Sequence, residues 1–184
     1  MTFQELEKAL IKGKRILKPI NNGTTIEKKG GYYSIWISDP KKMPAIFYEE
    51  LVKRKTSLIY IGIASGSLYQ RLYLQELQHR NAATFFRSIG AVLGYRPDPG
   101  SLVGKRNQNN YKFSQEHTKE IVEWINDYLE IAFHYGSTAD SSIEKMLIAK
   151  YKPLLNWTHN PEPFMPLKYL KDECRFVARN NKKG

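Results

Sequence analysis

The chain has 184 residues, of which 41% are hydrophobic, and it carries a formal net charge of +11. These values predict one globular domain, residues 1–184, and exclude a disordered chain. No apolar run is long enough to span a bilayer, a secretory signal is missing after Met1, and the single cysteine, Cys174, excludes an internal disulfide. We therefore expect a cytoplasmic protein without a membrane partner.

The positive charge is the most informative part of the composition. A pI near 9.6 predicts a phosphate-bearing partner, because counterions released from a nucleic acid favour binding. The Lys and Arg residues are densest in an N-terminal helix and loop, 1–30, and in a C-terminal segment, 158–184. A solvated basic face that only keeps the protein soluble is the alternative explanation.

Hydrophobic periodicity predicts the elements along the chain. Segments with helical spacing or a helix-start signal are 2–17, 44–53, a helix from Ser67 onward, 84–95, 114–129 and 140–153. The last of these is expected to be the final helix, because Pro153 stops it. Segments rich in β-branched and aromatic residues predict strands at 31–38, 58–64 and 129–136. This order predicts an α/β (α+β) fold, with a small central mixed or antiparallel sheet of about three strands flanked by helices.

Five polar residues interrupt these apolar elements. Tyr33 and Tyr60 lie in the first two predicted strands. Arg71 is expected to face the sheet, which is an unusual place for a guanidinium unless it holds an anion. Glu144 lies in the first turn of the helix at 140–153, and Asn156 follows that helix where the chain turns.

Each of these residues also has an ordinary structural explanation. The tyrosines can be core side chains with satisfied hydroxyls. Arg71 can form an ion pair with Glu76, and Glu144 can complete a capping box with Ser141. Asn156 can simply form a turn.

Matching motifs occur in a fixed order along the chain. They are Gly31-Tyr32-Tyr33, Tyr60-Ile61-Gly62, "LYQRL" at 68–72, Glu144 and "PLLN" at 153–156. Together they resemble the GIY-YIG endonuclease family, with a tyrosine where the first signature commonly has isoleucine. The resemblance implies a catalytic core at 31–157, with insertions near 39–57 and 80–128. Two positions depart from the family, because Gln75 stands where members often have histidine and Ile63 where many have lysine. His79, one helical turn further, is the candidate substitute for that histidine.

The resemblance implies endonucleolytic hydrolysis of DNA by one Mg²⁺ or Mn²⁺ ion, in a restriction-like or mobile-element enzyme. Glu144 would bind the metal, and Arg71 would hold the scissile phosphate. Tyr33 would deprotonate or orient the attacking water with Tyr60 beside it, and Asn156 would orient the site. Because a phenol has a pKa near 10, deprotonation by Tyr33 requires the metal or Arg71 to lower that pKa.

Substrate binding is expected mainly in the insertion, between residues 80 and 113. The predicted contacts to the DNA backbone are Arg87, Arg96, Lys105, Arg106 and Lys112. No role is predicted for His117, His134 and His159, which lack metal-site spacing. RNA is the alternative substrate, and a homodimer is expected if both strands of a duplex are cut. The alternative to an enzyme is a non-catalytic nucleic-acid-binding module on the same fold, which the missing histidine and lysine favour.

Overall fold

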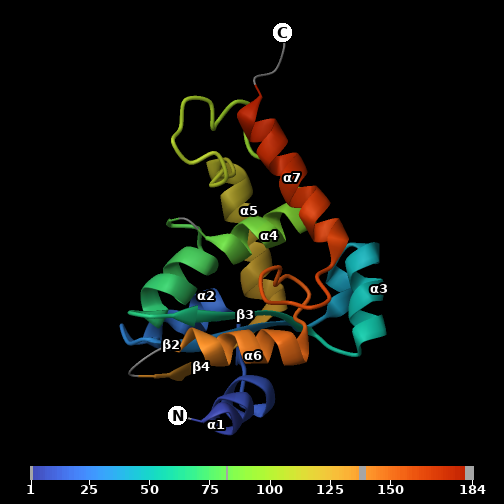
Figure 1. Ribbon diagram of the computed structural model, residues 1–184. Coiled ribbons are helices and arrows are strands. Elements are labelled where there is room, and N and C mark those ends of the chain that lie inside the picture. The colour runs from blue at the N-terminus through green and yellow to red at the C-terminus, as the bar shows by residue number, and fades with distance from the viewer. Residues whose placement is uncertain (1, 82, 137–139, 181–184) are drawn as a thin grey trace.

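The computed structural model describes residues 2–81, 83–136 and 140–180, so the last four residues of the predicted C-terminal segment lie outside it. Its centre is an antiparallel sheet with the strand order β1-β4-β2-β3 (Figure 1). The strands are β1 (Ile16–Leu17), β2 (Gly31–Ile37), β3 (Leu58–Ala64) and β4 (Leu129–Tyr135). The predicted antiparallel sheet and its three strands are therefore confirmed, and the short β1 is added at one edge.

Helices surround this sheet. The α-helices are α1 (Phe3–Glu7), α2 (Pro19–Asn22), α3 (Ala45–Arg54), α4 (Thr84–Val92), α5 (Gln115–Tyr128), α6 (Ser141–Tyr151) and α7 (Met165–Arg179). Two π-helical segments, η1 (Lys8–Lys12) and η4 (Tyr69–Glu76), and two 3₁₀ turns, η2 (Gly23–Thr25) and η3 (Pro40–Lys42), complete the set. Figure 1 shows α6 and α1 in the lower half of the molecule, and α4, α5 and α7 extending above the sheet.

Both faces of the sheet are covered, because successive side chains of a strand point to opposite sides. Tyr33 and Ile35 of β2 pack into the larger core, which α3, α4, α5 and α7 complete. Tyr32 and Trp36 point the other way, into a smaller core with α1, η1 and α6. A β2 sequence that is apolar at nearly every position is therefore explained by burial on both faces.

The predicted helix at 2–17 is wrong in its second half. The helical turns end at Lys12, and Gly13 has an extended backbone. Ile16 and Leu17 then pair with Ile131 and Glu130 of β4. Hydrogen bonding of Ile16 and Leu17 to β4 replaces helix formation here. The hydrophobic periodicity of residues 2–17 contains no information about a partner strand more than a hundred residues away.

The prediction that the helix at 140–153 is the last one is also wrong, because α7 follows it. Three fully buried residues of α7, Leu167, Cys174 and Ala178, have helical spacing and face the core. They are separated by charged residues, so the segment resembles a solvated basic tail in sequence. The loop at 94–113 fixes the end of α7, with the amide of Leu102 donating to the carbonyl of Ala178 at 2.7 Å.

Candidate active site

Tyr33 and Tyr60 lie on the same face of the sheet, in adjacent strands. The register pairs Tyr33 with Gly62 and Ile35 with Tyr60, which makes the two tyrosines diagonal neighbours. Their ring centroids are 6.3 Å apart and their planes are inclined by 28°. A Cβ at Gly62 would lie 2.4 Å from the Tyr33 hydroxyl oxygen. The glycine of "YIG" therefore makes room for the tyrosine of the neighbouring strand.

The Tyr33 hydroxyl is shielded from solvent. Its side chain is fully buried, and its oxygen makes no well-formed hydrogen bond to any residue in the described part of the chain. Burial raises the pKa of Tyr33 well above its ordinary value, and the nearby Glu76 charge adds to this rise. Arg71 lowers the same pKa, but by less. In this state Tyr33 holds its proton at neutral pH, so it is not ready to accept a proton from a water molecule.

Arg71, on η4, is held by a buried carboxylate. Its Nη2 lies 2.7 Å from Oε1 of Glu76, whose side chain is fully buried. Oε2 of Glu76 accepts a hydrogen bond of 2.8 Å from the amide of Phe85, in the first turn of α4. The ion pair that the sequence offers as an alternative for Arg71 is therefore present. The Arg71 side chain nevertheless stays 34% exposed, so it remains accessible to a ligand.

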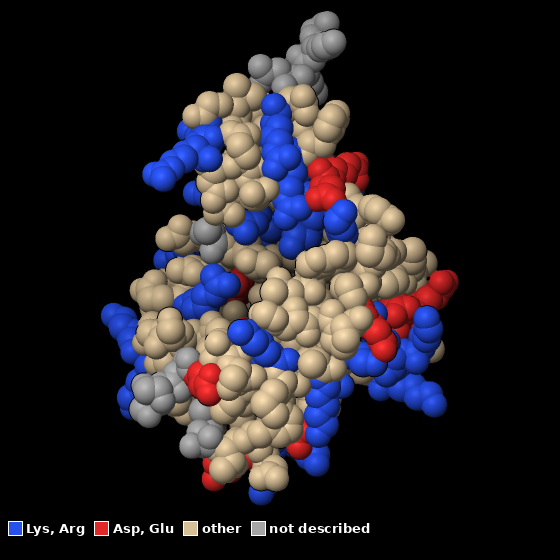
Figure 2. Space-filling view, in the orientation of Figure 1, with Lys and Arg blue, Asp and Glu red and all other residues tan. Residues whose placement is uncertain are grey.

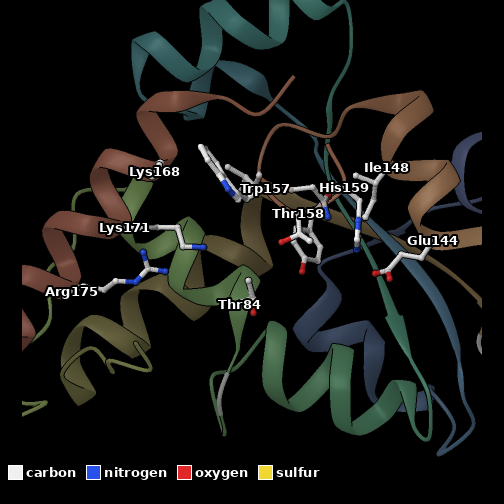
Figure 3. Close-up of a pocket in the computed structure, with 12 residues that line it drawn as sticks. Thr84, Glu144, Ile148, Trp157, Thr158, His159, Lys168, Lys171 and Arg175 are labelled. Carbon is white, nitrogen blue, oxygen red and sulfur yellow. The ribbon is translucent and has the colours of Figure 1, made fainter. Parts of the chain in front are cut away.

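Glu144 does not form the capping box that its spacing from Ser141 suggests. The residue that caps α6 is Asp140, whose carboxylate accepts a 2.7 Å hydrogen bond from the amide of Ser142. The Glu144 carboxylate makes no hydrogen bond or ion pair to the described residues and points into a cleft (Figure 3). Burial raises its pKa, and the charges of Arg71 and Lys145 oppose that rise.

The Glu144 carboxylate suits a hard divalent cation. Within residues 2–81, 83–136 and 140–180, no three carboxylate, imidazole or thiol side chains come close enough to form a complete metal cage. Mg²⁺ does not need one, because it keeps several of its waters and takes further oxygen ligands from substrate phosphate. A single free carboxylate at the wall of a basic cleft is consistent with that mode of binding.

Asn156 acts as a clamp on β3. Its side-chain oxygen accepts a 2.8 Å hydrogen bond from the amide of Ile61, and its side-chain nitrogen donates a 2.9 Å hydrogen bond to the carbonyl of the same residue. Ile61 is the middle residue of "YIG", so Asn156 fixes the backbone between Tyr60 and Gly62. Asn156 therefore holds the backbone of β3 at the wall of the cleft.

We expect Asn156→Ala to lower the free energy of unfolding by about 2–4 kcal/mol, because two buried backbone groups lose their partner. Urea denaturation measures this change. Asn126→Ala is the matched control and should cost about 1 kcal/mol or less, since Asn126 accepts an exposed hydrogen bond of 3.1 Å from the amide of Asn21. Equal losses in the two variants would contradict the clamp.

A cleft of about 450 Å³ lies between α6 and α7 (Figure 3). Three of the predicted catalytic residues line it: Tyr60, Glu144 and Asn156. Tyr33 is buried behind Tyr60, and Arg71 lines a separate shallow surface hollow with Gln75. Arg71 is still close enough to lower the pKa of Tyr33, Tyr60 and Glu144. The structure therefore brings all five predicted residues into one region, with two of them outside the cleft itself.

The opposite wall of the cleft is basic. Lys168, Lys171 and Arg175 of α7 line it, and Figure 2 shows a band of Lys and Arg side chains beside α7. These three residues are not among the predicted site residues, because no helix is expected in the basic C-terminal segment after Pro153. Trp157 and His159 also line the cleft, although no role is predicted for His159. Their position just after the "PLLN" motif could have identified Trp157 and His159 as candidate site residues from the sequence.

The predicted DNA contacts lie in two kinds of environment. Lys105, Arg106 and Lys112 are exposed on or beside the loop at 94–113. Arg96 binds the carbonyls of Ala91 and Tyr95 and pairs with Glu173, so it supports the fold around α7. Arg87 is half-buried on α4, behind the basic wall.

His79 lies in an apolar environment. Its ring centroid is 4.5 Å from that of Phe86 and 6.2 Å from that of Phe113. Burial, followed by the charges of Arg87 and Lys112, lowers the pKa of His79 to about 4. The imidazole is therefore neutral at physiological pH and does not line the cleft, which places it apart from Glu144.

One comparison with known proteins found a match. No curated protein and no solved structure matched the chain. A family model, the GIY-YIG catalytic domain, matches residues 31–175, which extend from β2 into α7. The match covers most of the chain and includes both tyrosines, Arg71, Glu144 and Asn156. The chain therefore belongs to the GIY-YIG catalytic-domain family, a family of nucleases.

Proposed function

We propose that this protein is a metal-dependent endonuclease that hydrolyses phosphodiester bonds of DNA, with Mg²⁺ or Mn²⁺ bound at Glu144. The observation that carries the proposal is the free Glu144 carboxylate, which is not used in capping α6 and points into a cleft with a basic opposite wall. Hydrolysis needs a positioned water and neutralisation of charge at the phosphate, and these two sides of the cleft supply complementary parts of that task.

The residue roles follow from their positions. Glu144 would hold the metal ion, which when bound supplies a Lewis acid and a more acidic water. Arg71 would bind an oxygen of the scissile phosphate through the part of its guanidinium that Glu76 leaves accessible. Tyr33 would orient the attacking water through its neutral hydroxyl, with Tyr60 beside it at the cleft.

A non-catalytic binding module is the second candidate, and one observation favours it. Glu76 already neutralises much of the Arg71 charge, which leaves less of it for a transition state. In such a module the basic wall would still hold nucleic acid. The two candidates differ in turnover, because a binding module does not cut.

Cleavage assays decide between them. We expect the protein to nick or linearise supercoiled plasmid with Mg²⁺ or Mn²⁺, and to leave it intact with a chelator. Mixed-sequence duplex and long genomic DNA test for a rare recognition site. An RNA of matched sequence tests whether the protein cuts RNA instead of DNA. Salt-sensitive binding without cleavage of any substrate would identify the binding module, whereas cleavage of RNA alone would correct the substrate.

A further inference from the structure

Two cationic side chains of α7 lie at the basic wall of the cleft, and a third, from α4, lies behind them. Lys171 and Arg175 extend from α7 toward Thr84, at the start of α4 (Figure 3). Arg87 lies one turn along α4, and its charge acts on both of them. Residues far apart in the sequence thus concentrate positive charge opposite Glu144.

The described residues offer this group too few acceptors. Nη1 of Arg175 binds Asp172 at 2.6 Å, but its Nε is buried without a hydrogen-bond partner. Nη1 of Arg87 is also buried without a hydrogen-bond partner among the described residues, and the guanidinium carbon lies 5.9 Å from the centroid of the Tyr111 ring. The charge of the buried Glu76 carboxylate acts on Arg87 and Lys171, but this carboxylate is already paired with Arg71. Native proteins rarely leave buried donors unpaired, so these donors have the capacity to bind a further acceptor, and the surrounding positive charge favours an anion.

The protonation of Lys171 agrees with this picture. Its pKa is lowered to about 8, first by burial and then by the charges of Arg175 and Arg87. Glu76 and Asp172 act in the opposite direction but do not compensate. A bound anion would offset the excess positive charge around Lys171. Anion binding and protonation of Lys171 should therefore favour each other.

We propose that Arg87, Lys171 and Arg175 form an anchoring site for one backbone phosphate of the nucleic acid, on the wall of the cleft opposite Glu144. This proposal rests on the proposed function for the identity of the ligand. An anchored phosphate would fix the position of the strand while a different phosphodiester lies at Glu144. Two guanidiniums and an ammonium supply directional, charge-assisted donors for such a phosphate.

The test is binding of a fluorescein-labelled, mixed-sequence DNA duplex without metal. Fluorescence anisotropy measures the affinity in EDTA at several salt concentrations. Lys171→Met should weaken binding about tenfold and reduce the slope of log affinity against log salt by about one. Lys171→Arg should keep the wild-type affinity and slope. Lys119→Met, which removes an exposed charge on α5 paired with Glu123, is the control and should change affinity about twofold or less.

The same assay at pH 7 to 9.5 adds an independent readout. Wild-type affinity should fall as the pH passes through about 8, where Lys171 loses its proton, and Lys171→Arg should not show this fall. Thermal unfolding checks that the variants fold. Removing a destabilised buried charge should leave the melting temperature of Lys171→Met unchanged or higher.

Equal weakening by Lys171→Met and Lys119→Met, or the same pH dependence in wild type and Lys171→Arg, would overturn the anchoring site. Because no metal is present, this result is separate from cleavage. If the binding results are as expected but the protein never cuts, the anchoring site is supported and the proposed nuclease function is contradicted. A protein that cuts with metal but lacks the pattern is a nuclease without this site.

Discussion

Glu144→Gln is expected to lower metal-dependent cleavage by at least about 1000-fold, because a bound metal contributes several kcal/mol to the transition state and each 1.4 kcal/mol is a factor of ten in rate. The substitution keeps the shape of the side chain and removes its charge. Since the carboxylate makes no hydrogen bond within the described structure and is not the cap of α6, the fold should be unaffected. Initial rates on supercoiled plasmid, measured against metal concentration, give the effect.

Binding and stability distinguish this loss from a general defect. Metal-free affinity for duplex DNA should be unchanged or slightly tighter, since a negative charge leaves a basic cleft. Glu123→Gln, at an exposed acidic position of α5, is the matched control and should cut at the wild-type rate. If Glu144→Gln cut at that rate as well, the metal would have to be held elsewhere.

Tyr33→Phe should change activity and stability in opposite directions. If the hydroxyl orients the attacking water as proposed, its loss should lower the cleavage rate by about 100-fold or more. The same hydroxyl is buried without a well-formed hydrogen bond, so removing it should raise the free energy of unfolding by about 1 kcal/mol. Single-turnover cleavage and urea denaturation measure the two effects on one preparation.

Tyr73→Phe provides the opposite pattern as a control. Its hydroxyl donates a 2.9 Å hydrogen bond to the carbonyl of Ile20, so the variant should be less stable by about 1 kcal/mol and should still cleave DNA. Wild-type cleavage by Tyr33→Phe would show that the buried hydroxyl has no part in the reaction. A loss of stability in that variant would show that the hydroxyl is satisfied in solution.

The strands and the motif positions could be predicted from the sequence, because local patterns determine them. Apolar residues at nearly every position identify β2 and β3, whereas the pairing of Tyr33 with Gly62 is seen only in the structure. The role of Glu144 could not be decided in this way. Its spacing from Ser141 fits a capping box, and only the three-dimensional structure shows that Asp140 caps the helix instead.

The basic wall of the cleft could not be predicted for a different reason. Lys171 and Arg175 belong to α7, whose buried residues are too sparse to stand out among its charges. Arg87 comes from a helix more than eighty residues earlier, and only packing of α4 on α7 brings the cations together. The pKa of Tyr33 is likewise a product of burial, which reverses the direction that a lone arginine neighbour would give.

The Asn156 clamp also has a consequence for the behaviour of the protein at high concentration. β3 is an edge strand, and an exposed edge is a template on which another chain can add a strand and begin to aggregate. Here Asn156 occupies the amide and carbonyl of Ile61, and the amide of Leu155 donates to the carbonyl of Ile59 at 2.8 Å. The same two residues that shape the cleft therefore close the edge of the sheet to unwanted self-association.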